Sequence, residues 1–224
     1  MKKIIFKYVI EFSVIVLGIS VSFWFDKYQT SLDNIDREKE VLTELSTELE
    51  VIENTIKNRD SVFRFDKENL VRIIDDKVAN ISFTYNDLLI ASTDYRGFSP
   101  SEEIYTSLKY DGGLKFIRNS KIKVAIESFY NGTKYGVVAN MEDEIVVQRE
   151  ILKYIQYNHP QIIIKISKMK ISEFEKIKLF TNIVQKDSTL KSLLVSKLRF
   201  MNSKLIFLQR YKSSLSTLKN LITT

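Results

Sequence analysis

Residues 35–63 read IDREKEVLTELSTELEVIENTIKNRDSVF, with apolar side chains at every third or fourth position over most of the stretch. This spacing is typical of a heptad seam along one face of an α-helix, here interrupted at Glu38 and Arg59. An apolar seam must be covered, either by a second copy of the chain or by another helix of the same chain in a bundle. The stretch therefore predicts a long amphipathic helix in an all-α protein. The seam consists of Ile35, Leu42, Leu45, Leu49, Ile52, Ile56 and Phe63.

The chain upstream of this helix is largely apolar from Ile4 to Phe25 and begins with Lys2 and Lys3. A helix of that length would extend about 33 Å, which is enough to cross a hydrocarbon core of about 30 Å. A cleaved signal peptide would end in small residues, whereas this run ends in Phe23-Trp-Phe25. Residues 1–25 therefore predict an N-terminal membrane anchor, one transmembrane helix that continues into a long-helix bundle or coiled-coil domain.

Charge next to the apolar run indicates the orientation of the anchor. Three lysines, Lys2, Lys3 and Lys7, lie at its N-terminal end, and residues 26–53 are mainly acidic. Because basic residues near a span favour the cytoplasmic side, we expect a single-pass protein of the inner (cell) membrane with a cytoplasmic N-terminus. Residues 26–224 would then form an extracytoplasmic helical domain.

Two residues inside the predicted span are candidates for a functional role. Glu11 places a carboxyl group within the apolar run, where an ionisable side chain is costly and is by default a functional hypothesis. Its carboxyl group could hydrogen-bond to a partner membrane helix or form a proton-coupled site. Alternatively, the side chain could extend to the membrane interface or pair with Lys7. Gly18 offers a small surface for close approach of another helix.

The domain after the anchor divides into three helical parts. We expect a stalk-like helix over 26–80, a helical middle over 86–158 and C-terminal helices over 172–224. The pattern of 161–172 is compatible with a strand, an extended connection or the start of a helix. The last helix has a heptad-like stripe that invites antiparallel packing on the stalk. That stripe contains Leu190, Leu194, Leu198, Met201, Leu205, Leu208, Leu215, Leu218 and Ile222.

A compact motif in the middle part reads as a helix–turn–helix corner. Ser99 and Pro100 have the chemistry of a helix start, and Gly112-Gly113 can supply the positive φ at which the helix would end. Asn119 or Ser120 can then cap the next helix. Caps and buried anchors explain every residue type in the motif, which comprises Tyr105, Leu108, Gly112, Leu114, Ile117 and Asn119.

The amino-acid composition limits the kinds of catalytic and metal sites that the chain could form. The chain has no Cys and one His, His159, so thiolate chemistry is excluded and a histidine metal cluster or a Ser-His-Asp triad is not expected. Nucleotide-binding, metalloprotease and hydrolase motifs are absent from the sequence. We therefore expect no enzyme activity, no cofactor and no metal.

The net positive charge of the chain comes from the segment after residue 150, because residues 1–150 hold more acidic than basic side chains. This segment could bind nucleic acid or anionic lipid, with Arg199, Phe200, Arg210 and Tyr211 placing charge beside aromatic rings. It could equally be a basic helical hairpin packed against acidic helices of the same domain. Binding of nucleic acid would require a cytoplasmic domain, which the predicted orientation disfavours.

Two stretches resemble a family. Glu11, Gly18 and Ile19 have the spacing seen in the opening of an uncharacterised bacterial group of membrane-anchored helical proteins, domain-of-unknown-function family 6090. The chain departs from it at Asp26-Lys-Tyr28. The corner motif, with Ile122 and Phe129-Tyr130 downstream, is similar to the family's second conserved stretch. The resemblance implies an N-terminal anchor and an all-helical body, and it carries over no catalytic residue.

These observations together predict a non-enzymatic single-pass membrane protein. Its helical domain would act as a scaffold, an accessory subunit or a sensing subunit of a membrane assembly. The expected partners are membrane lipid and either a second copy of the chain or another membrane protein, reached through the anchor and the heptad seams. The alternative is a membrane-tethered binder of nucleic acid or anionic lipid that uses the basic C-terminal helix.

Overall fold

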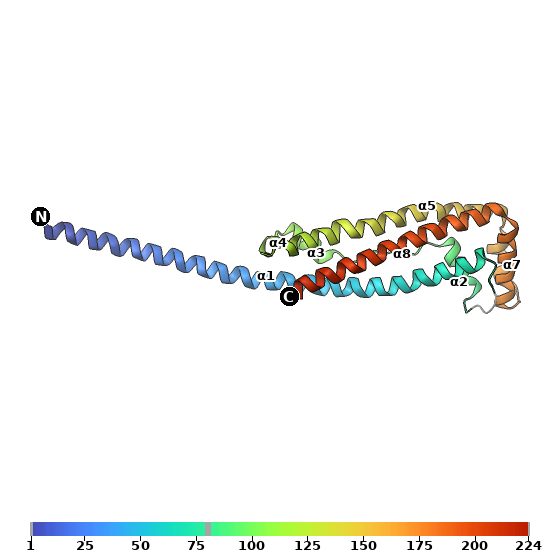
Figure 1. The fold of residues 1–224 in the computed structure, drawn as a ribbon, viewed down its shortest axis with the longest axis horizontal. Coiled ribbons are helices and arrows are strands. Elements are labelled where there is room, and N and C mark those ends of the chain that lie inside the picture. Colours follow the sequence, from blue (N-terminus) through green and yellow to red (C-terminus); the bar gives the residue numbers. More distant parts are fainter. Residues whose placement is uncertain (1, 79–81, 224) are drawn as a thin grey trace.

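The computed structural model describes residues 2–78 and 82–223, with side chains from Glu11 onward. Every element within these ranges is a helix, so the predicted all-α class is confirmed for the part described. The first, α1 (Lys2–Ile74), has 73 residues and extends about 110 Å. Figure 1 shows that its N-terminal part projects alone, whereas its C-terminal part belongs to an elongated bundle.

The chain traverses the bundle lengthwise four times. Helix α1 runs to the distal end, where α2 (Tyr85–Thr93) lies, and an extended segment (94–102) leads back to α3 (Glu103–Tyr110) and the short η1 (Gly113–Phe116). The chain then runs outward again through α4 (Ser120–Glu127), the π-helical turn η2 (Ser128–Thr133) and α5 (Lys134–Asn158). Helix α8 (Ser188–Thr223) returns along α1, antiparallel to it, as the two apolar stripes predict.

The distal end is closed by short helices. These are α6 (Gln161–Ile164), η3 (Ile166–Lys168) and α7 (Glu173–Lys186), which crosses the end of the bundle in Figure 1. The segment 161–172, which the sequence left open, is thus largely helical. Ser172 caps α7 by accepting a hydrogen bond from the backbone N–H of Glu175, and the Glu175 carboxylate accepts one from the backbone N–H of Ser172.

The heptad seam of α1 is covered within the same chain. Leu45, Leu49 and Ile56 are at most 1% exposed and pack in a cluster to which α8 contributes Leu208 and Leu215. A second cluster lies toward the distal end and includes Leu70 and Ile73 of α1 together with residues of α2, α5, α7 and α8. The bundle alternative is therefore the one that this structure contains.

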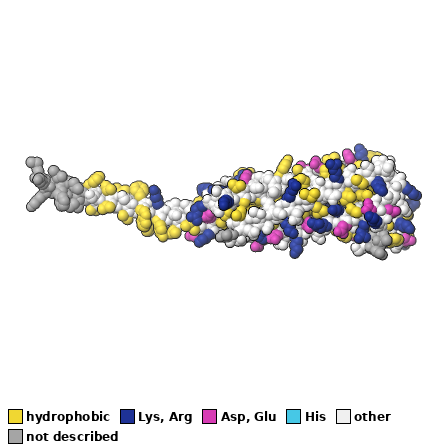
Figure 2. All heavy atoms as spheres, in the orientation of Figure 1, with side chains coloured by type: hydrophobic (Ala, Val, Ile, Leu, Met, Phe, Trp, Pro, Cys, Tyr) yellow, Lys and Arg dark blue, Asp and Glu magenta, His cyan; other side chains and the backbone are white. Residues whose placement is uncertain are grey.

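The apolar run ahead of the bundle stays uncovered. In the part of the chain whose side chains are described, which begins at Glu11, the structure contains no helix that is long and apolar enough to cross a membrane. Residues 4–10 of the predicted span lie outside those described side chains. The described apolar part from Phe12 to Phe25 is helical and projects beyond the bundle, where Figure 2 shows it as a yellow surface.

The corner motif lies at the proximal end of the bundle, nearest the projecting helix. Gly112 has φ 71° and follows α3, and the Asn119 side chain accepts a hydrogen bond from the backbone N–H of Lys121 at the start of α4. Tyr105, Leu108 and Ile117 are buried there. Leu114 packs against the same cluster.

The helix start expected at Ser99 and Pro100 is wrong. Both residues precede α3, which begins at Glu103, and Glu102 makes no capping hydrogen bond with its own side chain. The donors at this end are satisfied by Glu48 of α1, a residue more than fifty positions away in the sequence. Local sequence signals could not identify such a cap.

Replacing Gly112 tests the left-handed backbone. A Cβ at φ 71° is strained, most of all in a β-branched residue, so Gly112→Val should lower the free energy of unfolding by about 1–3 kcal/mol. Gly112→Asn is the matched control, because Asn tolerates this conformation and should cost less. Thermal unfolding followed by circular dichroism measures both, and an unchanged melting temperature for Gly112→Val would refute the helix-end interpretation.

Candidate functional site

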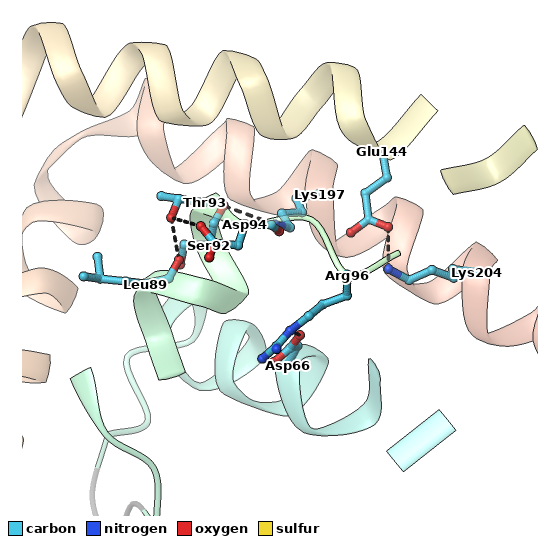
Figure 3. A network of polar contacts seen from close by, with 9 residues as sticks. All are labelled: Asp66, Leu89, Ser92, Thr93, Asp94, Arg96, Glu144, Lys197 and Lys204. Carbon is cyan, nitrogen blue, oxygen red and sulfur yellow. Dashed lines mark hydrogen bonds and ion pairs between the residues drawn. The ribbon is translucent and has the colours of Figure 1, made fainter. Parts of the chain in front are cut away.

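A layer of buried charged and polar side chains separates the two apolar clusters (Figure 3). It forms where α1, α5 and α8 pass the end of α2 and the extended segment that follows it. Its buried members are Asp66, Asn69, Ser92, Thr93, Glu144, Lys197 and Lys204, and they are joined by the half-buried Arg96 and Gln148 and by the backbone carbonyl of the exposed Asp94. Burying several charges in the middle of a bundle is expensive, so each one needs a partner.

Lys204 and Glu144 form the central ion pair of this layer. The Lys204 Nζ lies 2.5 Å from Glu144 Oε2, and the two residues are 1% and 2% exposed. The same ammonium group lies 4.1 Å from the centre of the Phe63 ring, which adds a cation–π contact from α1. This pair therefore joins α5 to α8 and brings the charge of Lys204 against α1.

Lys197 holds the C-terminal end of α2. Its Nζ donates to the backbone carbonyls of Ser92 at 3.3 Å and Asp94 at 3.0 Å. A cation is favourable there because carbonyl groups at a helix C-terminus lack intrahelical partners. Burial lowers the pKa of Lys197 to about 8, against an opposing contribution from Glu144 that raises it.

The extended segment 94–102 is fastened at two further points. The Arg96 guanidinium donates to both carboxylate oxygens of Asp66, at 3.0 and 3.3 Å, and Asp66 is 1% exposed. Glu48, 2% exposed, accepts hydrogen bonds from the Ser101 hydroxyl and from the backbone N–H groups of Ile104 and Tyr105. Side chains of α1 and α8 thus hold both ends and the middle of this segment.

Aromatic rings surround Glu48. Tyr130, carried by the π-helical turn η2, donates its hydroxyl to Glu48 Oε2 at 2.6 Å and stacks on Tyr105 with ring centres 4.1 Å apart. Burial and the Glu48 carboxylate raise the pKa of Tyr130. The Tyr105 hydroxyl donates to Glu127 and receives a hydrogen bond from Asn131. The π-helical turn therefore places Tyr130 and Asn131 so that both reach this network.

This arrangement holds the bundle together rather than presenting reactive groups. Lys197, the one lysine here with a clearly lowered pKa, is 1% exposed and its donors point at backbone carbonyls. Glu144 and Glu48 are equally enclosed. A substrate could reach none of them without opening the bundle. Among the described residues there is no group of three His, Cys, Asp or Glu that could hold a metal ion.

His159 takes part in a second, smaller network near the distal end. Its Nε2 lies 2.6 Å from Asp187 Oδ2, and the same carboxylate accepts the hydroxyl of Tyr154 and the backbone N–H of Leu190 at the start of α8. These contacts, with His159 first, lower the pKa of Asp187 to about 2. The histidine therefore joins the end of α5 to the start of α8.

The candidate residues of the predicted membrane span lie elsewhere. Glu11 and Gly18 are on the exposed, projecting part of α1, and a Cβ added at Gly18 would meet no atom within 4 Å. The structure therefore brings neither residue to the buried layer. The sequence pattern gives no sign of that layer, because Lys, Glu and Asp between apolar positions are typical of a solvated helix face.

The basic C-terminal helix is less available than its sequence implies. Arg199 and Arg210 are exposed, but Tyr211 is fully buried and stacks on Phe129 with ring centres 4.6 Å apart. Lys197 and Lys204 are also inside the bundle. Tyr211 thus cannot stack on a base in this conformation.

The lowered pKa of Lys197 predicts a pH dependence. Its unfolded-state pKa is near 10.5 and its folded-state pKa about 8, so between these values the unfolded chain binds more protons and stability rises with pH. Denaturant unfolding should show a gain on the order of 1–2 kcal/mol between about pH 8 and 9.5, and Lys197→Met should remove this gain. Above about pH 10 the buried tyrosines act in the opposite direction. Their pKa is raised in the folded state, so they ionise first in the unfolded chain, and the free energy of unfolding then falls as the pH rises. A slope that persists in Lys197→Met would contradict the assignment.

Comparisons with known proteins found no matching family model, no matching curated protein and no matching solved structure. The resemblance to the membrane-anchored helical family therefore stays a prediction.

Proposed function

We propose that this chain is a non-enzymatic, single-pass membrane protein whose helical bundle is a scaffold, accessory or sensing subunit of a membrane assembly. The projecting part of α1 anchors it, and the bundle presents its side surfaces and its distal end to partners. The domain lies outside the cytoplasm, as the lysines before the span favour.

The observation that carries the proposal is the uncovered apolar section of α1. Phe12, Leu17 and Val21 are between 62% and 69% exposed, Trp24 is 67% exposed, and the described part of the helix is exposed throughout residues 11–33. A contiguous apolar surface of this kind marks a membrane or protein contact. The apolar run continues in sequence to Ile4, which favours the membrane.

The end of the apolar section has the aromatic chemistry of a membrane interface. Trp24 and Tyr28 stack one helical turn apart, with ring centres 5.8 Å apart, immediately before the chain becomes polar. Tryptophan and tyrosine are enriched at the level of lipid headgroups because each ring has an apolar body and a polar tip. This pair supports a boundary of the span near residues 24–28.

The rest of the fold suits a rigid spacer. Helix α1 passes without interruption from the projecting part into the bundle, so displacement of the bundle is transmitted to the anchor. The charged side chains in the buried layer of the bundle are paired with one another or with backbone carbonyls, which favours a structural role over catalysis. Binding of nucleic acid by α8 is the weaker candidate, because its expected stacking residue Tyr211 is buried.

The absence of cysteine allows a direct test of topology. Ser99 is exposed on the extended segment, so Ser99→Cys offers a single thiol. We expect a membrane-impermeant maleimide to label it in intact inner membranes from the extracytoplasmic side. We also expect the full chain to stay in the membrane fraction after alkaline extraction. Labelling only after lysis would reverse the orientation, and extraction by alkali would refute the anchor.

Glu11 provides a separate prediction about assembly. If its carboxyl group contacts a partner membrane helix or carries a proton, Glu11→Gln should weaken oligomers that persist in mild detergent, by about 0.5–2 kcal/mol per contact. Crosslinking of the full chain in membranes measures this, with Ser22→Ala as a matched control in the same section. Unchanged crosslinking in Glu11→Gln would leave Glu11 without a role in assembly.

A further inference from the structure

The proximal end of the bundle carries a cationic surface that neither the fold nor the proposed function explains. We define this bundle tip as residues 109–123, the end of α3, η1 and the start of α4. It lies beside α1 at the point where the projecting helix leaves the bundle (Figure 1). Glu38 of α1 fixes it there by accepting from the backbone N–H and the guanidinium of Arg118, at 2.7 and 2.6 Å.

The tip is strongly basic. It holds one acidic side chain, Asp111, against five exposed basic ones: Lys109, Lys115, Arg118, Lys121 and Lys123. Glu38 neutralises Arg118. In the part of the chain that is described, Lys115, Lys121 and Lys123 are exposed and form no ion pair, although the Lys123 amine donates a long hydrogen bond of 3.5 Å to the backbone carbonyl of Lys115. Asp36, nearby on α1, already pairs with Lys39 at 3.9 Å.

Aromatic side chains accompany these charges. Tyr110 is 85% exposed. The ring of Phe116 is flanked by two cations, with Arg37 5.1 Å and Lys115 5.0 Å from its centre. Lysine beside tyrosine or phenylalanine suits contact with a headgroup layer, since the amines meet phosphate while the rings cover the aliphatic parts of the lysine side chains.

The distance to the proposed membrane suits this role. Glu38, which marks the level of the tip, lies 13 residues beyond Phe25, a rise of about 20 Å. Headgroups fill about 5–7 Å of this on each side of the hydrocarbon core. A tilt of α1 by about 20° lowers a tip that is displaced sideways from the helix axis toward the membrane. The lysine side chains are long and their charge acts over a Debye length of about 8 Å, so they come within reach of the headgroups.

We propose that the bundle tip binds the anionic headgroups of the membrane in which the N-terminal helix is anchored. This inference rests on the proposed function. Anchor and tip together are two attachment points, so they set the tilt of the bundle relative to the membrane. Each lysine near an anionic surface strengthens the attraction by roughly fivefold, which makes lipid composition a determinant of that tilt.

The test uses the full chain in vesicles. Ser120→Cys, on the tip, carries a single fluorophore, and a nitroxide on lipid headgroups quenches it on contact. We expect at least about twofold more quenching in phosphatidylcholine vesicles that contain about one-third phosphatidylglycerol than in phosphatidylcholine alone. The difference should vanish at about 1 M salt, where the Debye length is about 3 Å.

Matched variants separate position from net charge. The triple variant Lys115→Gln, Lys121→Gln and Lys123→Gln should lose the difference, whereas Lys165→Gln, Lys168→Gln and Lys170→Gln at the distal end should keep it. A fluorophore at Ser167→Cys, also distal, should stay unquenched. Equal quenching in both lipids would overturn the inference, and so would release of the tip from vesicles by an oligonucleotide at matched ionic strength.

Failure of the inference is distinguishable from failure of the anchor. Protein that floats with vesicles and resists alkaline extraction but shows no lipid-dependent quenching keeps the anchor and refutes the tip contact. Protein that is extracted by alkali refutes both.

Discussion

Glu144→Ala should destabilise the bundle by about 3–5 kcal/mol. The substitution leaves the ammonium group of Lys204, 1% exposed, without the carboxylate that lies 2.5 Å away. Phe63 still faces the ammonium, but a cation–π contact offsets only about 2 kcal/mol of such a cost. Urea unfolding of the full chain, followed by circular dichroism, measures the change.

A double substitution shows whether the cost arises from an unpaired charge. Glu144→Leu with Lys204→Met replaces both partners by apolar side chains of similar volume and should be close to neutral or stabilising. Asp36→Ala, which breaks the exposed pair with Lys39, is the control and should change stability by less than about 1 kcal/mol. A double variant as unstable as Glu144→Ala would show that packing, not charge pairing, dominates at this position.

Glu48→Ala should be about as damaging, for a different reason. It removes the acceptor for the backbone N–H groups of Ile104 and Tyr105 and for the hydroxyl of Tyr130. Each buried donor left unsatisfied costs about 1–3 kcal/mol, so we expect a loss of about 3–5 kcal/mol in total. The stack of Tyr130 on Tyr105 should loosen with it.

Local measurements make this prediction specific. Hydrogen exchange at the amides of Ile104 and Tyr105 should accelerate in Glu48→Ala, because these donors lose their partner. Glu50→Ala, on the exposed side of the same helix, should change stability by no more than about 0.5 kcal/mol. Unchanged exchange at both amides would refute Glu48 as the cap of α3.

Sequence reasoning succeeded where the signal is local. The stripe from Ile35 to Phe63 predicts the amphipathic part of α1, and the C-terminal helices expected over 172–224 are present as α7 and α8. Gly112 and Asn119 occupy the backbone positions that the corner motif indicates. Each of these features depends on residues within a few positions of one another.

Prediction from the sequence failed for contacts between residues that are far apart in the chain. Ser99 and Pro100 have the composition of a helix start, yet α3 begins at Glu103 and is capped by Glu48. Lys204 and Lys197 read as a charged helix face, and both are inside the bundle because Glu144 and the end of α2 meet them there. Their partners are 60 and 105 positions away, beyond any periodicity that a sequence window can contain.

The sequence by itself determined that this chain is helical and that its first segment is apolar enough to need a cover. Each backbone hydrogen bond in a helix joins residues four positions apart. The spacing of apolar residues, the capping residues and the scarcity of Pro and Gly are therefore enough to predict that the chain is helical. Only the tertiary structure decided which helix covers the seam of α1 and which charges are buried. Burial of a charge becomes tolerable only when a distant group arrives to pair with it, and that pairing is a property of the assembled bundle.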